Sequence, residues 1–211
     1  MIFKHFIAGP FQTNNYLLID ETSQKALLID CSGEIGDVLE TLKKHNASLE
    51  KIILTHGHID HIAGCYDLKD QTGAQIFVNE EDMFLIKNTQ KQLQMFGLPP
   101  EKEAPVDGFI KDGETIQIGD IKIKAIHTPG HTKGGMCYLI EDKLFSGDTL
   151  FLGSVGRTDL PGGDYKELED SILNKIFTLK GDLDIYSGHG PKTTLEYEKK
   201  NNPFFGQNPI A

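Results

Sequence analysis

The chain has 211 residues, of which 38% are hydrophobic and 25% charged, and its formal net charge is −10 at pH 7. This length and composition are typical of one globular domain with a sizeable core. The negative charge disfavours nucleic acid as a partner, because phosphate backbones bind to basic surfaces.

Three further features concern location. No apolar run approaches the roughly 20 residues of a membrane span, so we expect no membrane insertion. The N-terminus lacks the apolar core and small-residue cleavage site of a secretory signal. The three cysteines, Cys31, Cys65 and Cys137, form no paired motif, which disfavours a disulfide framework. Together these features predict a cytoplasmic protein with small buried thiols.

Extended and helical patterns alternate along the chain, which predicts an α/β fold. The predicted elements, in chain order, are strands over 14–20 and 25–30, a helix over 34–45, a strand over 51–54, a helix over 60–71, a strand over 75–78, a helix over 80–96, a hairpin over 115–118 and 121–126, strands over 135–140 and 143–146, a helix over 165–179, a strand over 183–186 and a helix over 193–200. Polar, glycine-rich breaks follow the strands, and binding groups commonly lie on such loops.

Histidines and aspartates are concentrated in these breaks. Four of them occupy six consecutive positions, and three more lie beside glycines after later strands: His56, His58, Asp60 and His61, then His131, Asp148 and His189. Neutral imidazole and carboxylate are suitable ligands for zinc, iron and manganese. The alternative, a set of ordinary surface and capping residues, does not explain so many ligand types in one pattern.

The spacing predicts two metal sites. His56 and His58 can reach one metal from a turn that leaves a strand, with His131 as third ligand. Asp60 and His61 can reach a second metal from the start of a helix, with His189. Asp148 can bridge both, and two metals ~3.5–4 Å apart hold a hydroxide between them.

Other candidates lie outside this pattern. For His5, His45 and His127 we expect structural roles, although His127 is close enough in sequence to His131 to support it. Asp30 ends a predicted strand and either supports a ligand or starts a turn. Residues 80–105 form either a lid or pocket wall, through Phe84, Met95, Phe96 and Leu98, or simple packing.

Residues 55–61, which read Thr-His-Gly-His-Ile-Asp-His, resemble the T-H-x-H-x-D-H signature of the metallo-β-lactamase superfamily. Residues 128–132, 146–149 and 188–191 match its later motifs in the same order. The resemblance implies an α/β, αββα four-layer sandwich in a single domain over 1–211, with metals at one sheet edge. Residues 188–194 and 156–159 further resemble short bacterial members of the glyoxalase II (hydroxyacylglutathione hydrolase) branch.

The resemblance implies a metal-dependent thioester hydrolase that acts on S-D-lactoylglutathione through a hydroxide between two divalent metal ions. We expect zinc, with iron and manganese as alternatives. Asp60 would also orient the hydroxide. A thiolate leaving group needs little acid help, because its pKa is about 8–9. The chain ends soon after Asn202-Pro203, so we expect no separate C-terminal helical glutathione-binding domain.

Candidate substrate anchors are fewer. Arg157 is the only arginine of the chain, which indicates a site that needs a planar fork. It either clamps a substrate carboxylate or pairs with Asp159 or Asp164. Lys133 and Lys192 are weaker candidates, because a solvated lysine is the default.

Three rival functions stay open. The resemblance extends to persulfide dioxygenases, whose single iron would here be held by His56, His131 and Asp148. Another hydrolase of the superfamily, such as a lactonase or β-lactamase-like enzyme, is the second rival. A non-enzymatic binding module is the third.

Overall fold

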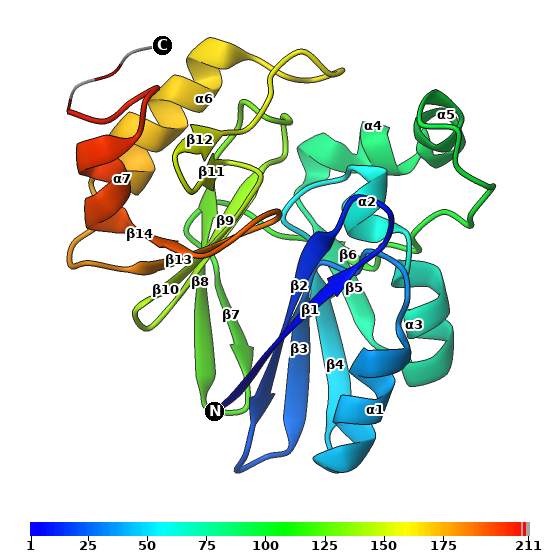
Figure 1. Ribbon diagram of the computed structural model, residues 1–211. Helices are drawn as coiled ribbons and strands as arrows, with labels where there is room; N and C mark the ends of the chain where they lie inside the picture. The colour runs from blue at the N-terminus through cyan, green and yellow to red at the C-terminus, as the bar shows by residue number, and fades with distance from the viewer. Residues whose placement is uncertain (208, 210–211) are drawn as a thin grey trace. The chain divides into compact units, whose positions relative to one another are not determined.

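Strands of the N-terminal half form a six-stranded sheet in the order β1-β2-β3-β4-β5-β6 (Figure 1). Their bounds are β1 Ile2–Ala8, β2 Thr13–Asp20, β3 Lys25–Ile29, β4 Ser48–Ile53, β5 Gln75–Val78 and β6 Gly108–Phe109. The first three are antiparallel and joined by short turns, whereas β3 to β6 pair in parallel. Neighbouring parallel strands need long crossover connections. Their carboxyl ends lie together at one edge of the sheet.

Helices supply those crossovers. In this half they are α1 Gly36–Lys44, α2 Ile59–Ile62, α3 Cys65–Thr72, the 3₁₀ turn η1 Glu80–Asp82, α4 Met83–Ile86 and α5 Thr89–Met95. Val38 and Leu42 of α1 and Leu68 of α3 join Leu28 and Ile52 in one buried cluster. Burying these apolar faces against the sheet is the main source of their stability.

Two predicted helices are divided in the structure. The helix expected over 60–71 is interrupted at Gly64, whose N–H donates to the Cys31 carbonyl at 2.9 Å. A Cβ on Gly64 would lie 2.9 Å from Cys31 Sγ, so this close approach requires glycine. The helix expected over 80–96 becomes η1, α4 and α5, and the side chains of Asn88 and Thr89 bond to carbonyls of the preceding turn where α4 gives way to α5.

A second six-stranded sheet has the order β14-β13-β10-β9-β8-β7. Its strands are β7 Thr115–Ile118, β8 Ile121–His127, β9 Met136–Ile140, β10 Lys143–Gly147, β13 Asp184–Ser187 and β14 Thr193–Thr194, and a small hairpin joins β11 Leu150–Phe151 to β12 Ser154–Val155. The two-residue strands β6, β11, β12 and β14 were not predicted, because they carry no readable alternation. The predicted hairpin over 115–126 corresponds to β7 and β8.

Helices α6 Tyr165–Ser171 and α7 Leu195–Asn201 pack against this second sheet. Leu168 and Ile172 contribute to a buried cluster that also holds Leu144, Ile185 and Leu195. A π-helical segment, η2 Ile172–Ile176, continues α6 where a regular helix over 165–179 was expected. The segment keeps Ile172 and Ile176 buried, so the predicted apolar face is correct although the helix type is not.

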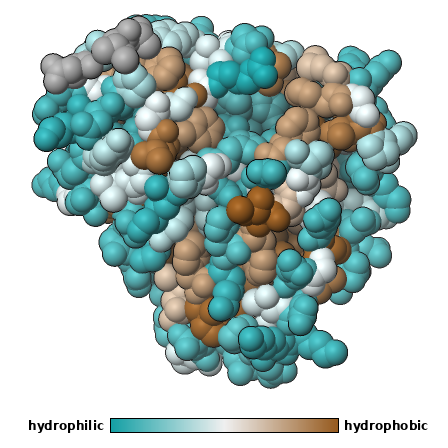
Figure 2. All heavy atoms as spheres, in the orientation of Figure 1, coloured by the Kyte–Doolittle hydropathy of each residue, from teal (hydrophilic) through white to brown (hydrophobic). Residues whose placement is uncertain are grey.

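The chain divides into two compact units, Met1–Ile110 with Ile116–Lys122, and Lys111–Thr115 with Ile123–Ala211. The structure, a computed structural model, describes residues 1–207 and 209. Over these residues, no helix combines the length and the apolar character needed to cross a membrane. Hydrophilic atoms dominate the face in Figure 2, and hydrophobic atoms appear there in separate patches.

Candidate metal centre

The loop that carries the first histidines starts where β3 and β4 end side by side. Asp30 follows β3 and is 1% exposed, with a left-handed φ of +59°, a region that aspartate tolerates better than most residues. Its Oδ1 accepts a hydrogen bond from the Thr55 backbone at 2.7 Å, and its Oδ2 accepts one from the Thr55 hydroxyl at 2.8 Å. Asp30 therefore fixes the first residue after β4.

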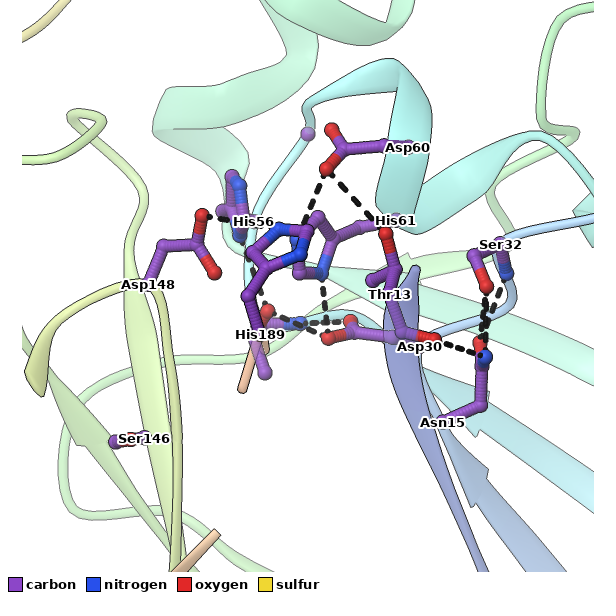
Figure 3. Close-up of polar contacts among 12 residues, drawn as sticks. Thr13, Asn15, Asp30, Ser32, His56, Asp60, His61, Ser146, Asp148 and His189 are labelled. Carbon is purple, nitrogen blue, oxygen red and sulfur yellow. Dashed lines mark hydrogen bonds and ion pairs between the residues drawn. The ribbon is translucent and has the colours of Figure 1, made fainter. Parts of the chain in front are cut away.

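The same carboxylate orients His61, since Asp30 Oδ2 lies 2.8 Å from His61 Nδ1 (Figure 3). The Cys31 N–H also donates to the His61 carbonyl at 2.8 Å. With Nδ1–H donated to Asp30, the lone pair of His61 is on Nε2, which is how metal-binding histidines are commonly held. Of the two roles considered for Asp30, the structure shows a contact with His61, which is a candidate ligand.

The protonated nitrogen of His56 can be assigned from its hydrogen bonds in the same way. The Thr55 hydroxyl gives its proton to Asp30, so at 3.1 Å it accepts from His56 Nδ1. His56 then presents Nε2 as its lone-pair nitrogen. His56 is 2% exposed and His61 is fully buried, so neither ring is a solvated surface group.

Two further buried side chains hold the backbone around His58. The Gly57 N–H donates to Asp82 Oδ2 at 2.9 Å. Gln92 donates to the Gly57 carbonyl at 3.1 Å and accepts from the Ile59 N–H at 3.0 Å. A Cβ on Gly57 would lie 2.9 Å from Leu85 Cβ, so the His-Gly-His turn has room only for glycine. The sequence did not point to Asp82 or Gln92, because polar residues in a helical segment usually face solvent.

The first unit thus gathers four of the predicted ligands. Candidate ligand atoms of His56 lie within 4.8 Å of those of His58 and of His61, and Asp60 and His61 are within the same distance. Asp60 Oδ2 is 3.6 Å from His61 Nε2 and accepts a 3.4 Å hydrogen bond from the Thr13 hydroxyl. Thr13, at the start of β2, was not a predicted site residue.

The other three predicted ligands gather within the second unit. Asp148 Oδ2 lies 3.5 Å from His131 Nε2 and 3.5 Å from His189 Nε2. His131 Nδ1 is 2.7 Å from the Arg157 carbonyl, to which it donates. The 3.5 Å separations exceed hydrogen-bond length, and His131, whose Nδ1 donates to Arg157, turns the lone pair of Nε2 toward the carboxylate. This donor set fits a cation between them.

Glycines close the second cluster tightly. A Cβ on Gly156 would lie 2.0 Å from the Asp148 carbonyl oxygen and 3.1 Å from His131 Cβ. Gly130, directly before His131, has a φ of +131°, and a Cβ there would lie 2.2 Å from the Leu168 nitrogen. Both positions require glycine, which explains why the loops with His131 and Arg157 approach so closely.

Arg157 forms a bidentate ion pair with Asp159 in the structure. Its Nε and NH2 groups donate to the two Asp159 oxygens at 2.7 and 2.6 Å. Both side chains are exposed, and the guanidinium lowers the pKa of Asp159 to about 2. The pairing considered as an alternative for Arg157 is therefore present here. A role in substrate binding stays a prediction.

The remaining basic candidates differ in their surroundings. Lys192 lies 2.9 Å from both carboxylate oxygens of Asp184. Lys133 is exposed, and its carbonyl is 2.8 Å from His127 Nε2. This contact restrains the loop that carries His131.

The histidines outside the ligand pattern have contacts of their own. His5 bonds to Asn14 Oδ1 at 2.7 Å, and the backbone N–H of His45 caps the end of α1. The ring contacts of His5 and His127 agree with the structural roles expected for them, whereas the contact at His45 is made by its backbone N–H.

Comparison with known proteins shows which family has this sequence pattern and fold. The family model described as the metallo-β-lactamase superfamily matches residues 8–189. A hydroxyacylglutathione hydrolase, GloC of Haemophilus influenzae, is 38% identical over 198 residues, which cover 92% of this chain and 93% of that protein.

Two solved structures are similar over nearly the whole chain. The BLEG-1 B3 metallo-β-lactamase has a TM-score of 0.89 at 34% identity and covers 96% of this chain and 99% of its own. The protein TTHA1623, solved in a di-iron-bound form, has a TM-score of 0.85 at 32% identity and covers 96% of this chain and all of its own. These likenesses confirm the predicted α/β fold.

Proposed function

Because the chain belongs to the metallo-β-lactamase superfamily and carries its histidine and aspartate motifs, we propose that it is a metal-dependent thioester hydrolase of the hydroxyacylglutathione type. The observation that carries the proposal is the approach of His131 and His189 to one oxygen of Asp148, each at 3.5 Å. A carboxylate shared by two imidazoles is the arrangement that a bridging ligand needs.

The proposed ligand set is the one predicted from spacing. His56, His58 and His131 would hold one ion, and Asp60, His61 and His189 the other, with Asp148 between them. The Nδ1 atoms of His56, His61 and His131 have acceptors, so each Nε2 carries the lone pair that would bind the ion. Two divalent ions would supply a water with its pKa lowered to about 7 and a Lewis acid for the carbonyl oxygen.

Side chains of this protein would orient the reactants. Asp60 receives its hydrogen bond from Thr13, which restrains the carboxylate that would orient the attacking water. The departing thiolate is stable near neutral pH, because thiol pKa values are about 8–9. The reaction therefore needs no additional general acid.

Arg157 is the proposed anchor for a glutathione carboxylate. A planar guanidinium binds carboxylates bidentately, as it binds Asp159 here. Since both partners are exposed, a substrate carboxylate could take the place of Asp159 at small energetic cost. Lys133 and Lys192 remain secondary candidates, and Lys192 would first have to leave Asp184.

A second candidate is β-lactam hydrolysis, favoured by the likeness to the BLEG-1 B3 metallo-β-lactamase. The same metals and the same attack on a carbonyl would serve both reactions. What separates the two reactions is the bond that is cleaved, a thioester C–S bond in one and an amide C–N bond in the other.

One combined experiment tests the proposal. Metal content of the purified protein is determined by elemental analysis, and the same sample is assayed on S-D-lactoylglutathione and on a β-lactam. We expect bound zinc, iron or manganese and faster hydrolysis of the thioester. Bound iron with oxygen uptake on glutathione persulfide, and no hydrolysis, would instead favour the dioxygenase. A protein without metal after growth with all three would contradict both.

A further inference from the structure

A pocket of about 250 Å³ opens within the first unit beside Asp60. Its walls come from the turn between β1 and β2, the loop after β3, helix α2 and the segment that ends α5. Asp60 and Thr13, which hydrogen bond to each other, both line it. The pocket therefore starts at a proposed metal ligand, although no catalytic step assigned above uses it.

The side chains around this pocket are mainly apolar. Phe11, Ile59, Ala63, Leu93 and Leu98 line it. Phe11 packs edge-on against Phe96, with ring centroids 5.2 Å apart, so the β1–β2 turn is held against the end of α5. Leu98 thus contributes to a pocket wall, one of the two roles considered for the 80–105 segment, whereas Phe84, Met95 and Phe96 are not among the residues that line this pocket.

The charges of the lining residues restrict which acyl groups the pocket can bind. The ionisable residues that line the pocket are Glu34, Asp60 and Glu101, and within the described part of the chain no lysine, arginine or histidine lines it. A carboxylate entering this pocket would lose hydration beside the acidic side chains of Glu34 and Glu101, with no basic side chain of the described lining to pair with. Glutathione carries carboxylates, so the thiol part of a thioester is disfavoured here.

We propose that this pocket receives the acyl chain of the substrate and selects uncharged, apolar acyl groups. The inference rests on the proposed thioester hydrolysis. Because a water-sized atom takes about 30 Å³ in the liquid, the volume holds on the order of eight such atoms. A hexanoyl group, with about seven non-hydrogen atoms, nearly fills this space, whereas a lactoyl group, with about five, leaves part of it empty.

The test measures kcat/KM of the metal-loaded enzyme on glutathione thioesters from acetyl to hexanoyl. Each buried methylene is worth about 0.8 kcal/mol, so kcat/KM should rise about fourfold per methylene. Succinylglutathione, whose acyl end is a carboxylate, should be hydrolysed at least about tenfold more slowly than butyrylglutathione. Glu101→Gln should narrow this difference.

Substitutions test whether the dependence on acyl-chain length arises in this pocket. Phe11→Ala and Leu98→Ala should flatten the rise with chain length, whereas Phe109→Ala should leave it intact. Phe109 is a matched control because it is 42% exposed, similar to Phe11 at 38%, and does not line the pocket. Thioester hydrolysis with no dependence on chain length, or an unchanged slope in Phe11→Ala and Leu98→Ala, would overturn the inference.

A binding measurement separates this failure from failure of the proposed function. Hexanamide and hexanoate are titrated into the protein while amide signals of Ala63 and Leu98 are followed by NMR. We expect hexanamide to shift both signals and hexanoate to shift neither. Absence of hydrolysis on every thioester would contradict the proposed function alone, and hexanamide shifts would then still support an apolar ligand site. Absence of any shift with hexanamide would overturn the inference that this pocket binds acyl chains.

Discussion

Asp30 and His61 form a buried pair in which a carboxylate oxygen lies 2.8 Å from the imidazole Nδ1. Both side chains are almost fully inaccessible, at 2% and 0% exposure. The same carboxylate accepts two hydrogen bonds from Thr55. One residue at the end of β3 thus positions the strand-to-helix loop and one of its histidines, which explains why the loop can present several ligands at once.

Replacing Asp30 by alanine should weaken metal binding about 10- to 100-fold, because the support of His61 and Thr55 is lost. Chelator competition measures the affinity. Asp20→Ala is the control, since Asp20 is also a buried carboxylate of the first unit but bonds to Ser23. Equal metal affinities for Asp30→Ala and the wild type would show that the pair does not orient a ligand.

The sequence pointed to the candidate ligands more directly than to the residues that support them. Histidine spacing pointed to His56, His58 and His61, because a metal demands particular side-chain types at particular places. Asp82 and Gln92 gave no such signal, since their role follows from burial, which depends on how the broken helices pack. Thr13 was missed for a similar reason, as it lies far from Asp60 in sequence.

For secondary structure too, the sequence predicted some features directly and gave no signal for others. The strands β2, β3, β5 and β10 were predicted within a residue or two, because apolar alternation and runs mark them directly. The interruption at Gly64 was not, because its cause is contact with Cys31, a residue of a distant loop. Contacts between distant segments leave no periodic trace in one sequence.

Gly156→Ala should reduce activity strongly and lower metal content. Its new Cβ would meet the Asp148 carbonyl at 2.0 Å, so the loops that hold Asp148 and His131 must separate. Gly36→Ala is the matched control, because nothing lies within 4 Å of a Cβ there. Circular dichroism shows whether each variant folds. Wild-type metal content in a folded Gly156→Ala variant would contradict the tight packing.

Asp148→Ala should abolish hydrolysis and lower the metal content, since the proposed bridging carboxylate is lost. Metal-replete kinetics and elemental analysis measure the two effects. Asp142→Ala serves as control, because that carboxylate is exposed and pairs with Lys143. Full activity of Asp148→Ala in excess metal would refute the bridging role.

Arg157→Ala should raise KM for glutathione thioesters much more than for neutral thioesters. Asp159→Asn should have the opposite effect, because it removes the carboxylate that competes for the guanidinium. Steady-state kinetics on both substrate classes decide between the roles, and equal changes in KM for the two classes would favour a purely structural pair.

The pH dependence of this pair follows from its pKa. Because the pKa of Asp159 is lowered from 3.8 to about 2, the pair is fully present above pH 4 and is lost only as the pH falls through about 2. The Arg157-dependent difference in KM should therefore be constant between pH 5 and pH 8. A change near pH 6 would assign it to another group.

The three cysteines should react slowly with iodoacetamide in the native protein. Burial raises the pKa of Cys137 to about 11, and a hydrogen bond with Cys31 together with burial raises that of Cys65 well above its usual value. The thiolate is the nucleophile, so labelling at pH 8 should require unfolding. Mass spectrometry counts the labels, and rapid native labelling would contradict the burial.

The most direct test of the two-metal account is an anomalous difference map from a crystal of the metal-loaded protein. The account predicts two peaks, one in contact with His56, His58 and His131 and the other with Asp60, His61 and His189, with Asp148 touching both. A single peak, or peaks bound to other residues while these seven side chains stay apart, would contradict it.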